Sequence, residues 1–250
     1  MGKAKWGVLL ALLLAGAAQA QTLTVCAERW LPFISRDSGG VVRGLAVDAL
    51  NRAAASRGVS VRYQFLAISG CYRQAASGGA DIVAFATAEE SPAGWLLTRK
   101  PMVYWPLYAW VRRDDGAQRY QGLQQFTGMR VAWVSNYDYP EQMSRHSNWT
   151  RVEAQDSYAS LTMLAGGRVD VVFDDVQATV DVSRQVGGRV KRLDGLVGSH
   201  QEDFSLRPGL AWLRDALDSE AAHMAANGEL DAFYRKYFQA SWEQVQAVPH

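Results

Sequence analysis

Two cysteines and four histidines are the most chemically versatile residues in this sequence of 250 amino acids. The histidines, His146, His200, His223 and His250, are scattered and lack the spacing of a zinc site. They also form no visible nucleophile–base arrangement, and no Gly-x-Ser-x-Gly motif is present. We therefore expect no catalytic residue, no metal and no cofactor.

The two cysteines, Cys26 and Cys71, suit a structural role instead. Cys26 lies on the first predicted strand, and Cys71 opens a predicted helix that should pack nearby. In an oxidising compartment such a pair is more often bridged than reactive. The bridge would close a loop of about 45 residues and stabilise the fold by roughly 4 kcal/mol before strain. Two separate buried thiols are the alternative.

Acidic and aromatic side chains follow the first predicted strand, where the sheet of an α/β fold opens into a cleft. They are Glu28, Trp30 and Phe33. The aromatic rings offer flat faces for stacking on a ligand or a cation, and ordinary core packing is the alternative. A second acidic pair, Glu89 and Glu90, could imitate catalytic carboxylates, but neighbouring acids in a loop are more often solvated.

The N-terminal segment has the pattern of a secretory signal. Lys3 and Lys5 precede an apolar run at 6–15, and small residues end in Ala-Gln-Ala at 18–20. The run is shorter than the roughly 20 apolar residues that span a bilayer. We expect cleavage after Ala20, a mature chain from Gln21 and a periplasmic location, with an uncleaved anchor as the alternative.

Charge and composition exclude several classes of partner. Lys and Arg number 26 against 25 Asp and Glu, which gives a net charge of +1, and 48% of residues are hydrophobic. A near-neutral chain without a basic block is poorly suited to nucleic acid or to a membrane surface. We therefore expect no nucleic-acid partner.

Strands alternate with helices along the chain. In the first half the predicted strands span 23–26, 59–66 and 81–86, and the predicted helices span 44–57 and 71–77. In the second half the strands span 130–134, 151–154 and 169–173, and the helices span 139–145 and 157–165. This order predicts an α/β fold of two similar lobes with mainly parallel sheets.

Two further segments, 103–113 and one near 200–207, are predicted to connect the lobes, and two amphipathic helices follow at 209–239. We place the signal peptide at 1–20, lobe one at 21–110 plus 205–250, and lobe two at 111–204. Two lobes joined by two crossings enclose a cleft that can close by hinge motion.

Eight short segments follow one another along the chain in a characteristic order. They are Leu23-Thr24-Val25, Trp30-Leu31-Pro32-Phe33, Gly44-Leu45-Ala46-Val47-Asp48-Ala49-Leu50, Ser77-Gly78-Gly79-Ala80-Asp81, Gly128-Met129-Arg130-Val131-Ala132, Gly167-Arg168-Val169-Asp170, Asn227-Gly228-Glu229-Leu230 and Tyr234-Arg235-Lys236-Tyr237-Phe238. By their order and spacing they resemble the bacterial extracellular solute-binding proteins of family 3, which include the polar amino-acid receptors of ABC importers. The resemblance covers nearly all of the mature chain and implies a type II periplasmic-binding-protein fold that delivers its ligand to a membrane permease.

The resemblance also implies ligand contacts at the end of the 81–86 strand, from Phe85, Ala86 and Thr87. In the family an Arg follows and pairs with the α-carboxylate of the ligand. Here the stretch 88–95 contains no Arg, and neither Ser nor Glu replaces a bidentate guanidinium contact. The ligand therefore need not be a standard α-amino acid.

In lobe two the resemblance implies contacts from Asn136, Tyr137 and Asp138, where the family presents a helix N-terminus to the carboxylate. Asp138 would repel a carboxylate and suit a cation or a hydroxyl, or it caps the following helix. Asp175 matches the family position that binds the α-amino group, and Asp174 does so if the register slips. An internal salt bridge is the alternative for Asp175.

These observations predict a monomeric periplasmic solute-binding protein, not an enzyme, that captures a small polar ligand for an ABC-type importer. The ligand is expected to be amine-bearing or amino-acid-like. Two alternatives stay open. One is a periplasmic enzyme on the same scaffold, similar to a dehydratase, with Glu28 or Asp138 transferring protons. The other is a sensor subunit that docks on a signalling partner.

Overall fold

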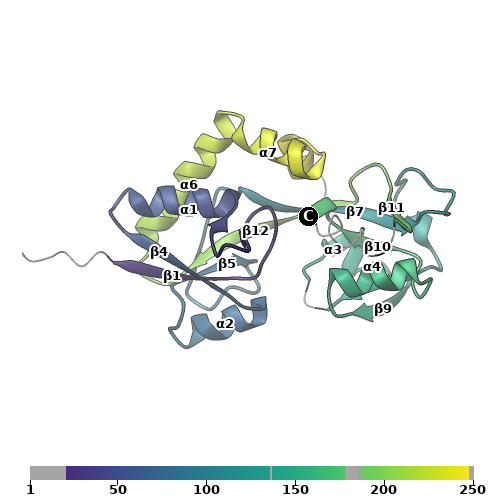
Figure 1. Ribbon diagram of the computed structural model, residues 1–250, viewed down its shortest axis with the longest axis horizontal. Coiled ribbons are helices and arrows are strands. Elements are labelled where there is room, and N and C mark those ends of the chain that lie inside the picture. The colour runs from purple at the N-terminus through teal and green to yellow at the C-terminus, as the bar shows by residue number, and fades with distance from the viewer. Residues whose placement is uncertain (1–20, 136, 178–185, 187, 248–250) are drawn as a thin grey trace, which may run out of the picture.

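Two long strands, β7 (Val103–Arg112) and β12 (Gly198–Leu206), run from one α/β lobe into the other (Figure 1). The computed structural model describes residues 21–135, 137–177, 186 and 188–247. Between the lobes, residues 103–107 of β7 pair antiparallel with residues 198–202 of β12. The predicted two-lobed α/β fold with two crossing segments is confirmed.

Lobe one is built on the strand order β12-β5-β1-β4. Strand β1 (Thr22–Ala27) pairs parallel with β4 (Ser60–Phe65) and with β5 (Ile82–Ala86), whereas β12 is antiparallel to β5. Strand β5 is buried along its whole length, as expected for an apolar strand covered on both faces. Three two-residue strands, β2 (Ser35–Arg36), β3 (Val42–Arg43) and β6 (Leu96–Leu97), lie at its periphery.

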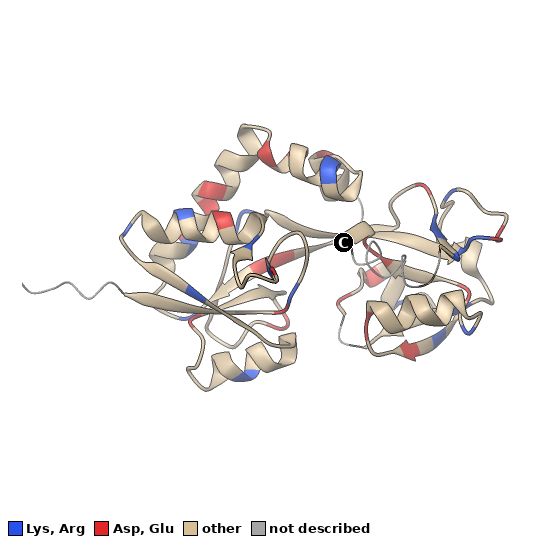
Figure 2. Cartoon of the chain, viewed as in Figure 1, with Lys and Arg blue, Asp and Glu red and all other residues tan. Residues whose placement is uncertain are grey.

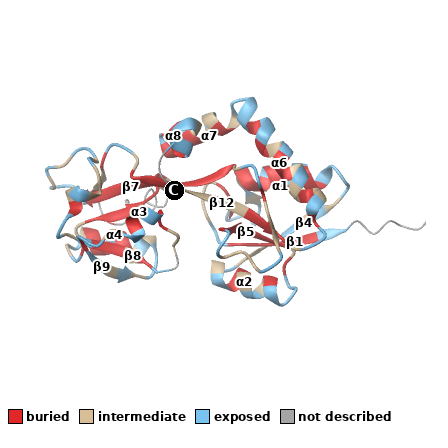
Figure 3. Cartoon of the chain, turned by 180° about the vertical axis from the view of Figure 1, so that it is seen from behind, coloured by how far each residue is buried: buried red, intermediate tan, exposed pale blue. Residues whose placement is uncertain are grey.

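Helices cover both faces of the lobe-one sheet (Figures 1 and 3). On one face lie α1 (Leu45–Ala55), α6 (Ala211–Ala226) and α7 (Glu229–Phe238), and α8 (Trp242–Ala247) follows them. On the other lies α2 (Ile68–Ala76), which is linked to β1 by the disulfide Cys26–Cys71. The Cα atoms of this pair are 5.3 Å apart, a normal separation for a bridged pair. The predicted disulfide is present in the structure.

Lobe two contains the parallel pair β8 (Arg130–Val134) and β9 (Thr150–Ala154). Strands β10 (Val172–Asp174) and β11 (Val190–Arg192) pair antiparallel with the far half of β7. Helix α4 (Ser157–Ala165) packs on them, and its first turn is capped by Asp156, which accepts a hydrogen bond from the amide of Ala159 at 2.7 Å. The short elements η1 (Leu123–Phe126) and α3 (Glu141–Ser144) complete the lobe.

The hydrophobic cores change along the connecting strands. Val103 and Tyr104 pack in the core of lobe one, whereas Trp105 already packs in that of lobe two. On the return, Val197 packs in lobe two and Phe204 in lobe one. On β7 the chain therefore passes from the core of lobe one to the core of lobe two between Tyr104 and Trp105. The sequence predicted the boundary between the lobes after residue 110.

Helix α3 is shorter than the predicted helix at 139–145. Pro140 precedes its first residue, and the residue before a proline is disfavoured in the helical region. Tyr139 is therefore outside the helix and is buried in the core of lobe two.

Across the described parts of the chain, no helix combines the length and the apolar character that a membrane crossing requires. The predicted signal peptide at 1–20 lies outside the described residues.

Candidate functional site

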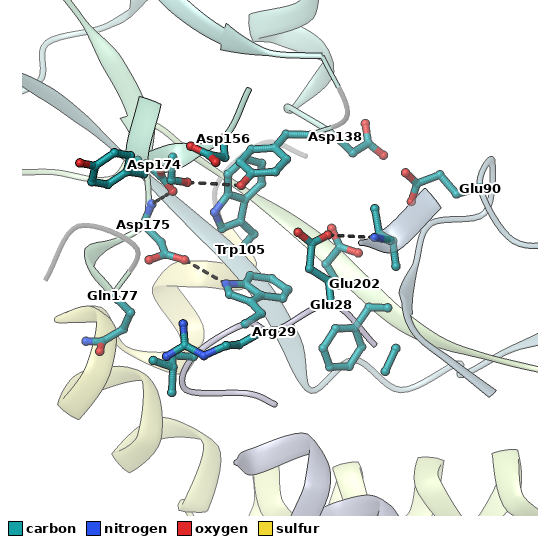
Figure 4. Close-up of a pocket in the computed structure, with 18 of the residues that line it drawn as sticks. Glu28, Arg29, Glu90, Trp105, Asp138, Asp156, Asp174, Asp175, Gln177 and Glu202 are labelled. Carbon is teal, nitrogen blue, oxygen red and sulfur yellow. Dashed lines mark hydrogen bonds between the residues drawn. The ribbon is translucent and has the colours of Figure 1, made fainter. Parts of the chain in front are cut away.

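A cleft of about 470 Å³ lies between the lobes and is lined by residues from both (Figure 4). Seven carboxylates line it, and among the described lining residues Arg29 is the only Lys or Arg. They are Glu28, Glu90, Asp138, Asp156, Asp174, Asp175 and Glu202. Glu202 lies on β12 and Asp174 is the last residue of β10, whereas the other five lie in loops. Figure 2 shows acidic residues where the two lobes face each other.

Two of the carboxylates, Asp174 and Asp175, lie at the end of β10. Both are almost wholly buried, and both line the cleft. Asp174 accepts a hydrogen bond from the amide of Asp175 at 2.8 Å. Burial and the adjacent charge of Asp175 raise the pKa of Asp174 well above its usual range. This end of the cleft therefore favours a bound positive charge.

Trp30 connects this acidic pair to lobe one. Its indole Nε1 donates to Oδ2 of Asp175 at 3.1 Å. The loop that carries Trp30 lies against the start of α1, where the backbone φ of Gly44 is 139° and a Cβ atom would stand 2.1 Å from the Phe33 carbonyl oxygen. Only glycine allows this approach, in which the Ala46 amide donates to the Phe33 carbonyl at 3.1 Å. Gly44 thus helps to place Trp30 at the cleft.

Aromatic rings form the wall between the acidic groups. Trp105 of β7 meets Tyr137 edge to face, with ring centroids 5.3 Å apart and an interplanar angle of 86°. Trp30 meets Phe85 in the same manner at 5.9 Å. In Figure 4 Trp105 lies between Asp174 and Asp175 on one side and Glu202 and Glu28 on the other. The wall offers apolar surface and ring faces that can attract a cation.

The opposite end of the cleft is formed around Glu202 of the connecting strand β12. Burial raises the pKa of Glu202 to about 6, although the nearby His200 side chain opposes the shift. His200 lies 3.7 Å from Glu202 through Nδ1 and 3.5 Å from Asp138 through Nε2. Desolvation lowers the pKa of His200, but the interactions with Glu202, Asp138 and Glu90 outweigh it and the net shift is upward. The pKa values of Glu202 and His200 are therefore both raised above their usual ranges.

Glu90 follows the end of β5, where the family resemblance implies an arginine. Its Oε2 accepts hydrogen bonds from the Thr87 amide at 3.1 Å, the Thr87 hydroxyl at 3.2 Å and the Tyr72 hydroxyl at 2.9 Å. The expectation that Glu90 is merely a solvated loop charge is wrong, because these bonds fold the loop back so that Glu90 lines the cleft. A negative charge thus stands in the part of the site where the family carries a positive one.

Six of the ten residues predicted to contact a ligand line the cleft, and their role in binding remains a prediction. They are Glu28, Trp30, Phe85, Tyr137, Asp138 and Asp175. Glu28 also accepts a hydrogen bond from the amide of Ile68, the first residue of α2, at 3.1 Å. The alternative that Asp138 caps α3 is wrong, because the residue before that helix is Pro140 and Asp138 faces His200 instead.

The other predicted residues lie elsewhere. Phe33 is wholly buried in the core of lobe one, stacked on Phe238 at 5.3 Å, so its expected position at the rim is wrong. Ala86 and Thr87 are buried behind the lining, where Thr87 holds Glu90. Asn136 lies outside the described residues.

Sequence reasoning missed several lining residues. The most prominent are Tyr72, Trp105, Asp156, Ser157, Gln177 and Glu202. Seven acids in one cleft raise the question of a metal ion, but in the described ranges no group of three His, Cys, Asp or Glu side chains is arranged to hold one.

Comparisons with known proteins agree with the architecture. No curated protein matches the chain. Among solved structures, a probable amino-acid ABC transporter extracellular-binding protein from Bacillus subtilis is 17% identical, with a TM-score of 0.69 over 88% of this chain and 98% of that one. An ancestral arginine-binding protein bound to arginine is 21% identical, with a TM-score of 0.65 over 87% and 98%. Holo ArgBP from T. maritima is 18% identical, with a TM-score of 0.64 over 86% and 95%.

These structures share the two-lobed fold with this chain. At the level of sequence, residues 23–240 match the family described as bacterial extracellular solute-binding proteins, family 3. The match spans most of the chain, including both lobes and both connecting strands. The chain therefore belongs to the bacterial extracellular solute-binding proteins of family 3.

Proposed function

We propose that this protein is a periplasmic receptor that captures a small amine-bearing cation in its cleft and presents it to the permease of an ABC-type importer. One observation carries the proposal. Seven carboxylates line the cleft, and Arg29 is the only cationic Lys or Arg among the described residues that line it. A solute-binding protein with such a lining is complementary to a positive charge and not to a carboxylate.

The cost of burying charge supports this choice of ligand. A buried carboxylate is unfavourable unless a positive group or several hydrogen bonds compensate it. For Asp174 this compensation is incomplete, because burial and the charge of Asp175 together raise its pKa and so disfavour the ionised form. An ammonium group placed beside the pair would form charge-assisted hydrogen bonds and favour the ionised form. One structural neighbour is an arginine-binding protein with arginine bound, which is consistent with a cationic class of ligand.

Closure follows from the way the lobes are joined. The paired segments of β7 and β12 are the connection between lobes, so bending there moves the end of β10 relative to Trp30. The hydrogen bond from Trp30 to Asp175 already spans the two lobes. A ligand that contacts both lobes binds the closed form better than the open one and shifts the population toward it.

One feature favours a second candidate function. Glu202 lines the cleft with His200 beside it, and both have raised pKa values, as a proton-transfer pair could have. An enzyme on this scaffold would consume its ligand, whereas a receptor binds it stoichiometrically and unchanged. Chromatography of the ligand after prolonged incubation with the protein distinguishes the two, and we expect it to be recovered intact.

Thermal-shift screening of the mature protein against amines, amino acids and dicarboxylates tests the proposal. A ligand at a hundred times its dissociation constant adds about 2.7 kcal/mol to the free energy of unfolding. We expect amines to raise the melting temperature and dicarboxylates to have no effect. Stabilisation by dicarboxylates alone would contradict the assignment.

A further inference from the structure

Two groups can be distinguished among the seven carboxylates of the cleft. One group is Asp174 and Asp175 at the end of β10, which we call the β10 pole. The other is centred on Glu202 in β12, which we call the β12 pole. Burial is the main cause of the raised pKa of both Asp174 and Glu202, but different charges lie near the two side chains. The charge near Asp174 is that of Asp175, whereas those near Glu202 are those of His200, Glu90 and Asp138.

The space between the poles is apolar. In Figure 4 Trp105 separates the labelled acids of the two poles. Trp30 and Phe85 continue this wall from lobe one, and the Trp105 ring is held by its edge-to-face contact with Tyr137. Such a surface is suited to methylene groups. Among the described lining residues, Arg29 is the only one that could offer a guanidinium or ammonium group to a carboxylate.

A ligand with a single positive charge would match only one of these poles. The β10 pole is buried, and its Asp175 is already oriented by the indole of Trp30. At the β12 pole, Glu202 is flanked by His200 at 3.7 Å, while Asp138 and Glu90 add further negative charge. Two cationic groups at the ends of an apolar linker would match both poles and the wall between them.

We infer that the ligand is a linear dication, two ammonium-type groups joined by a short aliphatic chain, with one group at Asp174 and Asp175 and the other at Glu202. This inference rests on the proposed function and narrows its ligand class. It assigns the specificity for the second charge to Glu202, a residue of the strand that connects the lobes. Binding at both poles would therefore place the ligand against the connecting strand as well as against the lobes.

Isothermal titration of the mature protein with compounds of one chain length tests the inference. The probes are 1,4-diaminobutane, butylamine and 4-aminobutanoate, and the series is repeated with three, five and six carbons. At the best length we expect the diamine to bind at least about tenfold more tightly than the monoamine, the effect of one additional charge-assisted hydrogen bond. Equal affinities of diamine and monoamine at every length would overturn the dication and leave the proposed function intact.

Variants locate the two charges. Glu202→Gln should reduce the ratio of diamine affinity to monoamine affinity to near one, because it removes the charge that the second ammonium group would meet. Asp175→Asn should weaken both compounds. Asp114→Asn is the matched control, since its side chain is 87% exposed and lies outside the cleft. Circular dichroism confirms that each variant is folded.

Two other outcomes have distinct meanings. A diamine-to-monoamine ratio that Glu202→Gln leaves unchanged would overturn the assignment of the second charge to that residue. Preferential binding of 4-aminobutanoate, or binding of none of the amines, would overturn the cationic ligand itself and with it the proposed function.

Discussion

The ends of β5 and β10 face the same cleft from opposite lobes, and the carboxylates at the two ends have different surroundings. At the end of β5, Glu90 receives three hydrogen bonds from Thr87 and Tyr72 within lobe one. At the end of β10, Asp174 and Asp175 are adjacent and buried, and the pKa of Asp174 is raised by burial and by its neighbour. The first wall has one carboxylate bound by three donors of its own lobe, whereas the second has two adjacent carboxylates, one of which is contacted by Trp30 of the other lobe.

This difference indicates that the two lobes contribute differently to the binding cleft. Lobe one is the more strongly constrained wall, because the disulfide joins β1 to α2 and α2 carries Tyr72. Lobe two contributes the buried charge that a cationic ligand would meet. Substitutions in each wall should therefore have different consequences for stability and for binding.

Removing the disulfide should have the largest effect on stability. Replacing Cys26 and Cys71 together by Ala opens a loop with a sequence separation of 45, and we expect the free energy of unfolding to fall by about 4 kcal/mol. Urea titration of the wild type and the double variant measures the loss. A reductant should destabilise the wild type and leave the variant unchanged. A loss below about 1 kcal/mol would contradict a constraining role for the bridge.

Neutralising the two strand ends should separate their roles. Asp175→Asn should weaken amine binding about ten- to a hundredfold, as loss of a charge-assisted hydrogen bond predicts. Glu90→Gln should have a smaller effect, because the donors of Thr87 and Tyr72 already share its charge. Isothermal titration gives both values. If Glu90→Gln weakened amine binding more than Asp175→Asn, the proposed difference between the two ends of the cleft would be contradicted.

Glu202 should make stability depend on pH. Its pKa is about 6 in the folded protein against a usual 4.5, so between these values the folded form retains a proton that the unfolded chain loses. Stability therefore falls as pH rises through this window, by roughly 2 kcal/mol. Urea midpoints from pH 4 to 7 should show this fall reduced in Glu202→Gln relative to wild type. Identical pH profiles would show that Glu202 carries no such shift.

The pair of Asp138 and His200 should matter least. The Asp138 side chain is 38% exposed and the charged atoms are 3.5 Å apart, and partly exposed pairs contribute less than about 1 kcal/mol. Asp138→Asn should therefore change the urea midpoint little. It should also lower the pKa of His200, because one of the charges that raise it is lost, and NMR titration of the imidazole measures this shift. An unchanged His200 pKa would contradict the proposed electrostatic coupling.

Local patterns in the sequence were sufficient for the architecture and for part of the cleft. Alternating strands and helices, paired cysteines and an acid just after the first strand were enough to predict the two lobes, the disulfide and the cleft position of Glu28. The cleft positions of Tyr137 and Asp175 were predicted from the family resemblance. Such residues follow strand ends, and the ends of neighbouring strands converge at one edge of a sheet.

The remaining lining residues depend on packing that local patterns do not contain. Glu202 and Trp105 lie within long connecting strands, where the side that faces the cleft depends on the register of the whole sheet. On β12 a bulge between Asp203 and Phe204 also interrupts the alternation of side chains. Phe33 follows a strand end as Trp30 does, but the close approach of Gly44 directs this segment into the core.

A crystal structure of the mature protein with its tightest-binding amine tests the cationic ligand most directly. We expect the ligand between the lobes, with an ammonium nitrogen within about 3 Å of a carboxylate oxygen of Asp174 or Asp175 and its carbon chain against Trp105. A ligand held instead by a negative group on Arg29, or bound outside the cleft, would contradict this assignment.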